Sequence, residues 1–182
     1  MAYRNGTYVA FHANKTKLPT ESDIKYYNLL KAWNVRSDNE FYFTNSHDKA
    51  AAVRDSSKRA TLESSLKNRL RNSKNMILVV GSTTKEDTDW VPFEIRYAVD
   101  ECEIPIIAAY PGRGPILSPG HLSDLWPEAL AIRIRNGSAH VIHVPFKRSP
   151  LADSVGQFNY NNYPAGGFDY YVREAYNSRG LL

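Results

Sequence analysis

Short apolar runs along the chain alternate with longer stretches in which apolar residues recur every three or four positions. The short runs have the length and composition of β-strands and lie at residues 8–11, 41–44, 76–80, 104–109 and 141–144. Residues 76–80 are apolar at every position, which is typical of a strand covered by helices on both faces of a parallel sheet. The pattern therefore predicts a sheet with residues 76–80 near its centre.

Helices are predicted between these strands. Leu62, Leu66 and Leu70 recur every four residues, which gives residues 57–72 one apolar face. Residues 24–33 show a similar periodicity after a polar sequence that is typical of a helix start. Both stretches are therefore predicted to be helices that pack on the sheet.

A third helix is expected to begin near Asp89, with Pro92 in its first turn, where the missing N–H group has no helical partner to lose. The pattern weakens after residue 120. Residues 122–134 show an ambiguous helical pattern. Residues 151–158 are predicted to be helical, and residues 169–176 are predicted to form a last helix.

Strands that alternate with helices imply right-handed βαβ crossovers. We therefore predict an α/β fold with an open, mainly parallel, flavodoxin-like five-stranded sheet and helices on both faces. The 182 residues are expected to form one domain, 1–182. Within it, the sequence pattern assigns secondary structure least clearly to residues 111–182. Ligands of such sheets bind beyond the carboxyl ends of the strands. The loops expected at that edge are residues 12–17, 45–56, 81–90 and 111–120.

Composition narrows the class of protein. A hydrophobic share of 42% argues against a disordered chain, and no run approaches the ~20 apolar residues of a membrane span. The N-terminal residues lack the features of a signal peptide. We therefore expect a soluble, cytoplasmic protein with no membrane partner.

Metal and nucleic-acid binding are not expected. Cys102 is the only cysteine, and His140 and His143 have no acidic or cysteine partner at ligand spacing, so no metal site is predicted. The net charge is +4, and the one dense basic stretch, residues 67–71, lies on a predicted helix without a nucleic-acid-binding motif.

The most specific local pattern joins Trp90 and Glu94, which lie four residues apart and about one turn from a helix N-terminus. The helix dipole favours an anion there. An ionised carboxylate suits cleavage of a bond between ribose and a cationic base, such as the nicotinamide of NAD, because the transition state is oxocarbenium-like and the base leaves neutral. Such a carboxylate would oppose the developing positive charge. The alternative from spacing alone is a surface glutamate beside a core tryptophan.

Further candidate substrate-binding residues lie where predicted strands end or beside Glu94: Phe11, His12, Asn45, Ser46, Asp48, Ser82, Thr83 and Trp90. Each also has an ordinary structural explanation, because Phe11 suits a core and Asx and Ser residues dominate turns. Arg113, in a loop rich in glycine and proline, could pair with a phosphate or remain solvated.

The segment around Glu94 resembles a known family. Residues 90–95 read Trp-Val-Pro-Phe-Glu-Ile, follow a buried strand that ends at 79–82, and precede the strand-like residues 104–107. This order resembles the third strand, third helix and fourth strand of TIR domains, and most closely the TIR-like proteins of the bacterial Thoeris antiphage system. Residues 8–12, which end in Phe-His, resemble the first strand of the same group. The similarity covers about residues 6–110.

The resemblance implies a TIR-like fold and an activity. In TIR enzymes the glutamate of the Trp-x-x-x-Glu arrangement is essential for NAD cleavage, which implies a catalytic role for Glu94. The Thoeris-like group implies NAD glycohydrolase or ADP-ribosyl cyclase activity, with NAD as substrate, no separate cofactor, and a nucleotide signal that acts on an effector protein in antiviral defence. Residues 11–15 depart from the Ser-Tyr and basic residues that follow the first strand in many NAD-cleaving TIR domains.

Two other classes of function stay open at the level of sequence. One is a non-enzymatic TIR-like signalling or interaction module, in which Glu94 is an ordinary residue. The other is a different N-glycoside-cleaving enzyme, similar to a nucleoside deoxyribosyltransferase. A homo-oligomer is compatible with each of these functions.

Overall fold

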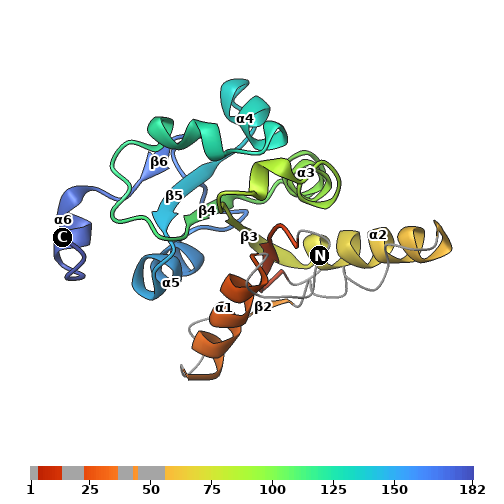
Figure 1. The fold of residues 1–182 in the computed structure, drawn as a ribbon, viewed down its shortest axis with the longest axis horizontal. Coiled ribbons are helices and arrows are strands. Elements are labelled where there is room, and N and C mark those ends of the chain that lie inside the picture. Colours follow the sequence, from red (N-terminus) through yellow and green to blue (C-terminus); the bar gives the residue numbers. More distant parts are fainter. Residues whose placement is uncertain (1–3, 14–22, 37–42, 45–55) are drawn as a thin grey trace.

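The computed structural model describes residues 4–13, 23–36, 43–44 and 56–182 (Figure 1). In chain order its elements are β1 (Gly6–Ala10), α1 (Ile24–Arg36), β2 (Phe43–Thr44), α2 (Ser56–Arg71), β3 (Ser73–Val79), the 3-10 helix η2 (Thr84–Glu86), α3 (Trp90–Arg96), the π-helix η3 (Tyr97–Glu101), β4 (Ile106–Tyr110), the 3-10 helix η4 (Pro119–Leu125), α4 (Glu128–Arg135), β5 (Val141–Pro145), α5 (Arg148–Gln157), β6 (Asp169–Tyr170) and α6 (Arg173–Asn177).

The strands form one open sheet with the order β2-β1-β3-β4-β5-β6, and every strand pair is parallel. The predicted α/β, flavodoxin-like fold is confirmed, with the five predicted strands as β1 to β5 and the two-residue β6 added at the edge. Because β1 lies between β2 and β3, the order of the strands reverses between β1 and β3. Crevices at such a switch point are the usual ligand sites of open parallel sheets.

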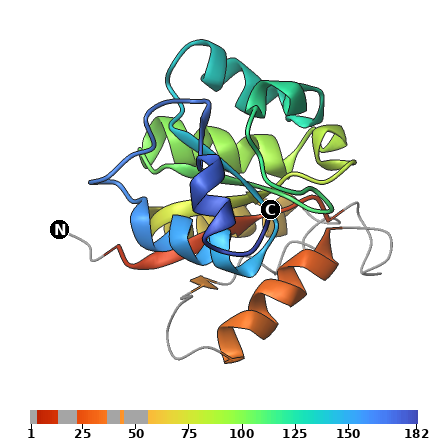
Figure 2. The same ribbon diagram turned by 90° about the vertical axis from the view of Figure 1, so that its left-hand side faces the viewer.

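Two layers of helices cover the sheet. One apolar cluster joins the sheet to α2, α3 and α4, and a second joins it to α1 and α5. Figure 2 shows α3 and α4 on one side of the sheet and α1 and α5 on the other. Side chains of a strand alternate between faces, so Tyr8 and Ala10 enter the first cluster, whereas Val9 and Phe11 enter the second. This alternation decides which residues of β1 can meet α3.

The helix predictions hold where the apolar spacing is regular. Leu62, Leu66 and Leu70 are buried beneath α2, and α3 begins at Trp90 with Pro92 in its first turn. The helical stretch at 122–134 is divided into η4 and α4, because a proline occupies the N-cap position of α4.

The predicted helix over residues 169–176 is wrong in its first part. Asp169 and Tyr170 form β6, which pairs with β5, and α6 begins only at Arg173. The Asp169 carboxylate accepts hydrogen bonds from the backbone N–H groups of Ala165 and Tyr170, at 2.8 and 2.9 Å. Aspartate side chains compete in this way with helical hydrogen bonds, so the extended conformation is favoured.

A buried hydrogen-bond chain joins β4 and β5 to the residues before β6. Trp126 Nε1 donates to Tyr110 Oη, which donates to Nδ1 of His143, each over 2.7 Å. The Nε2 of His143 donates to the carbonyl oxygen of Gly167 at 2.9 Å. Since that carbonyl can only accept, Nε2 carries a hydrogen, and burial lowers the pKa of His143 to about 4, so the imidazole is neutral at pH 7.

Acid is therefore expected to destabilise the fold through His143. The unfolded imidazole takes up a proton near pH 6.5, whereas the folded one does so near pH 4. Between these values the unfolded state binds more protons, so lowering the pH from 6.5 to 4 reduces the free energy of unfolding by up to about 3 kcal/mol. Urea denaturation at pH 7 and pH 4.5 measures the change. His143→Gln should remove most of it, and an equal pH dependence in His143→Gln and in the exposed-site variant His121→Gln would contradict the assignment.

Candidate functional site

The turn before α3 fixes the orientation of that helix. Asp87 Oδ1 accepts hydrogen bonds from the backbone N–H groups of Asp89 and Trp90, at 2.9 and 3.0 Å. These bonds satisfy donors at the helix start that have no partner within the helix. With the start held in this way, α3 presents Val91, Glu94 and Ile95 to the interior.

Glu94 is fully buried and faces the sheet. Its exposed fraction is 0%, and the Tyr8 hydroxyl on β1 donates a hydrogen bond of 2.5 Å to Glu94 Oε1. Burial raises the pKa of Tyr8 well above its usual value, and the neighbouring charge of Glu94 adds to the shift. The phenol therefore stays protonated at neutral pH and is a fixed donor to the carboxylate.

Trp90 is contacted by Arg59 of α2. The Arg59 guanidinium lies 4.8 Å from the centre of the indole ring and forms two hydrogen bonds with the Asp89 carboxylate, of 2.9 and 2.5 Å. Trp90 and Glu94 thus lie one turn apart on α3, but Trp90 contacts Arg59 while Glu94 contacts Tyr8. Trp90 also packs against the apolar cluster that contains Tyr8.

The dense basic stretch of the sequence also packs against α3. Lys67 lies 5.8 Å from the ring centre of Phe93, and Arg71 lies 5.5 Å from that of Tyr97. Such cation–π contacts contribute about 0.5–1 kcal/mol each at exposed sites. These contacts give Lys67 and Arg71 a structural role beside α3 and η3.

A second group of polar residues lies at the carboxyl ends of β1 and β3, which is the switch point of the sheet. His12 Nδ1 lies 3.3 Å from Thr83 Oγ1. Thr84 Oγ1 donates to Asp23 Oδ2 at 3.0 Å and accepts from the N–H of Gly81 at 2.8 Å. These contacts connect the segment after β1, the start of α1 and the loop after β3.

Asp23 and Gly81 approach each other closely. A Cβ atom on Gly81 would lie 2.5 Å from Asp23 Oδ1, so the position requires a glycine unless the carboxylate moves. Burial raises the pKa of Asp23, and the hydrogen bond from Thr84 opposes that shift. Asp23 is a buried, titratable carboxyl group beside the predicted residues His12 and Thr83.

The structure brings together only some of the predicted substrate-binding residues. His12 and Thr83 meet, and Ser82 lies exposed in the same loop. Phe11 is 2% exposed and stacks on Tyr27, with ring centres 5.3 Å apart, in the cluster on the opposite face of the sheet from Tyr8 and Glu94. Phe11 is therefore a core residue that does not meet Glu94.

Three predicted residues, Asn45, Ser46 and Asp48, lie outside the described residues. Tyr8 and Asp23 were not predicted as site residues. Tyr8 could have been found from the alternation of the first strand, which places it on the face opposite to Phe11. Nothing in the local sequence of Asp23 distinguishes it from an ordinary helix-start residue.

Two negative findings concern the described part of the chain. Within it, no group of three or more His, Cys, Asp or Glu side chains could hold a metal ion. None of the helices in the same ranges has the length and apolar character needed to cross a membrane.

The parallel sheet with its switch between β1 and β3, together with the buried carboxylate on the helix after β3, defines a TIR-like α/β domain. More particularly, the chain belongs to the family described as Thoeris protein ThsB, TIR-like domain, which matches residues 8–114. The matched segment runs from β1 to the loop after β4 and includes both Tyr8 and Glu94.

Proposed function

We propose that this protein cleaves NAD, releases nicotinamide, and makes ADP-ribose or a cyclic isomer of ADP-ribose as a signal in antiphage defence. Glu94 is the proposed catalytic residue. The observation that carries the proposal is the burial of a carboxylate on α3, held by the Tyr8 hydroxyl at 2.5 Å, within the segment that matches the Thoeris family.

The chemistry assigns one task to each group. The bond between the ribose carbon and the cationic nicotinamide nitrogen breaks, its electron pair returns to the nitrogen, and nicotinamide leaves neutral. Glu94 opposes the positive charge that develops on the ribose. A carboxylate has about four acceptor positions, so the bond from Tyr8 is compatible with a further bond to a ribose hydroxyl.

The second reactant decides the product. Attack by water on the ribosyl cation, with loss of a proton, gives ADP-ribose. Attack by a hydroxyl group of the same molecule, with loss of its proton, gives a cyclic isomer. The nucleotide product would then act on an effector protein.

Access to Glu94 is the remaining requirement. Its exposed fraction is 0%, so contact with ribose needs a rearrangement of the residues that cover it. We therefore expect slow turnover by the isolated protein and faster turnover once a trigger favours the open form.

The test is to incubate the concentrated protein with NAD, with and without lysate from phage-infected cells, and to resolve the products by chromatography and mass spectrometry. Nicotinamide together with ADP-ribose or a cyclic isomer supports the proposal. No loss of NAD under either condition favours the interaction module instead. Release of a base from nucleosides but not from NAD favours the other N-glycoside-cleaving class.

A further inference from the structure

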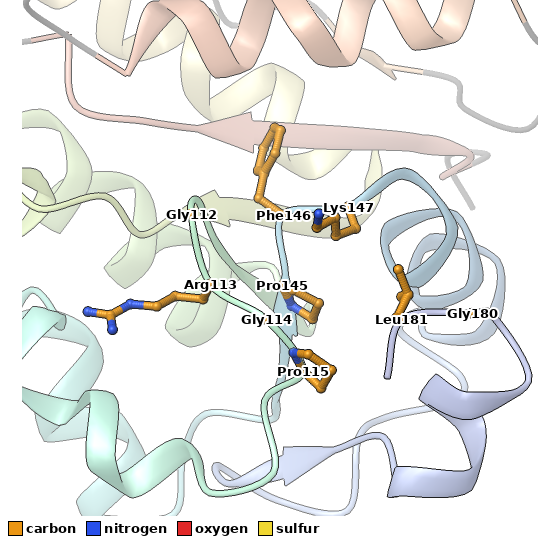
Figure 3. Close-up of a pocket in the computed structure, with 9 residues that line it drawn as sticks. All are labelled: Gly112, Arg113, Gly114, Pro115, Pro145, Phe146, Lys147, Gly180 and Leu181. Atoms are coloured by element: carbon orange, nitrogen blue, oxygen red, sulfur yellow. The ribbon is translucent and has the colours of Figure 1, made fainter.

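A cavity of about 450 Å³ lies beyond the carboxyl ends of β4 and β5 (Figure 3). Its walls come from three segments: the loop 112–115 after β4, the residues 145–147 at the end of β5, and the residues 180–181 after α6. Volumes of this size are typical of small-molecule sites. The cavity lies at the edge of the sheet where parallel α/β proteins bind ligands.

The C-terminal part of the chain builds one wall. Tyr176 on α6 is fully buried, and Arg179 Nε forms an ion pair with Asp153 of α5 at 2.5 Å. These contacts hold Gly180 and Leu181 against the cavity. The family match ends at residue 114, so most of this cavity is formed by residues outside the matched segment.

The charge of the lining is positive. Its nine residues include Arg113 and Lys147, and none of the nine is acidic. Lys147 is also the N-cap residue of α5, where the positive end of the helix dipole adds to its charge. In Figure 3 Lys147 lies between Phe146 and Leu181, whereas the Arg113 side chain extends away from them. Lys147 is therefore the cation best placed to contact a ligand.

The remaining side chains of the lining are apolar. Phe146 turns its ring away from the other labelled residues (Figure 3) and packs it against α1, with the ring centre 5.2 Å from that of Tyr26 and 5.5 Å from that of Trp33. The apolar side chains that remain to contact a ligand are those of Pro115, Pro145 and Leu181. Apolar walls beside a cation suit a ligand that combines a flat ring with phosphate groups.

We propose that this cavity is a second ligand site, separate from Glu94, which binds a nucleoside diphosphate. The inference goes beyond NAD cleavage and does not depend on it. Inorganic phosphate alone would leave the apolar walls unused, and an uncharged nucleoside would leave Lys147 unpaired by the ligand.

Calorimetric titration of the full chain with ADP tests the proposal. Lys147→Gln should weaken ADP binding about ten-fold, because a hydrogen bond to a charged group is lost. Arg113→Gln should weaken it only about three-fold, because the Arg113 side chain extends away from the other lining residues. The matched control is Arg135→Gln, an exposed position at the end of α4 before β5 begins, which should bind ADP as the wild type does.

Glu94→Gln distinguishes this site from the proposed catalytic one. It should bind ADP with unchanged affinity, whatever its effect on NAD. Loss of ADP binding in Glu94→Gln, equal affinities in Lys147→Gln and Arg135→Gln, or no ADP binding to the folded wild type would each overturn the proposal. Pyrophosphate that bound as tightly as ADP would overturn the assignment of a nucleotide.

Discussion

Glu94→Gln is expected to lower kcat for nicotinamide release by about 100-fold or more, which is the usual effect of removing one preorganised electrostatic group from an active site. Glutamine keeps the shape of the side chain but carries no charge to oppose the ribosyl cation. The change should therefore act on kcat more than on KM. Initial rates at several NAD concentrations, measured with the triggering lysate present, separate the two effects.

The matched control for this substitution is Glu101→Gln. Glu101 is exposed in η3, a short distance along the chain from Glu94, and has no role in the proposed reaction. It should keep the wild-type rate. Thermal unfolding of Glu94→Gln shows whether the protein is folded, and a folded variant with the wild-type kcat would refute the role of Glu94.

Tyr8→Phe is expected to lower the free energy of unfolding by about 2 kcal/mol, because a buried carboxylate loses a charge-assisted donor. The ring stays in place, so the apolar contacts of Tyr8 are retained. The same variant should lower kcat for nicotinamide release, because the proposed catalytic carboxylate loses the donor that holds it. Urea denaturation and initial rates at saturating NAD measure the two effects.

Tyr176→Phe is the control for this prediction. Tyr176 is also fully buried, but its hydroxyl lies 3.5 Å from the neutral carbonyl oxygen of Ile116. The same chemical change should therefore cost less stability there and leave kcat unchanged. Equal losses of stability in the two variants would show that the contact between Tyr8 and Glu94 has no special strength.

Much of the fold follows from local sequence patterns. The apolar run at 76–80 indicated a central strand, since only a strand covered on both faces needs no polar side, and it forms most of β3. The leucine spacing indicated α2, because an apolar residue at every fourth position gives a helix one face to bury. The pattern could not predict β6, because two residues of a Tyr-rich segment become a strand through pairing with β5 and not through their own periodicity.

The candidate site was predicted only in part. Val91, Glu94, Ile95 and Ala98 share one helical stripe and are buried, whereas the spacing of Trp90 and Glu94 alone had left a surface glutamate as an alternative. Its partner Tyr8 lies 86 residues away in the chain, and no local pattern reports such a contact. Phe11 was assigned to the pocket from its place at the end of a strand, and the structure places it in the apolar cluster on the face opposite to Tyr8.

The central claim is that Tyr8 and Glu94 act as one catalytic unit, and a double-mutant cycle tests it most directly. Nicotinamide release is measured for the wild type, Tyr8→Phe, Glu94→Gln and the double variant under the triggering condition. The account predicts that Tyr8→Phe lowers the rate of nicotinamide release in the wild type but causes no further loss of rate in the Glu94→Gln background, because the hydroxyl acts through the carboxylate. A double variant whose loss of rate equals the product of the two single losses, or a Glu94→Gln protein as fast as the wild type, would contradict it.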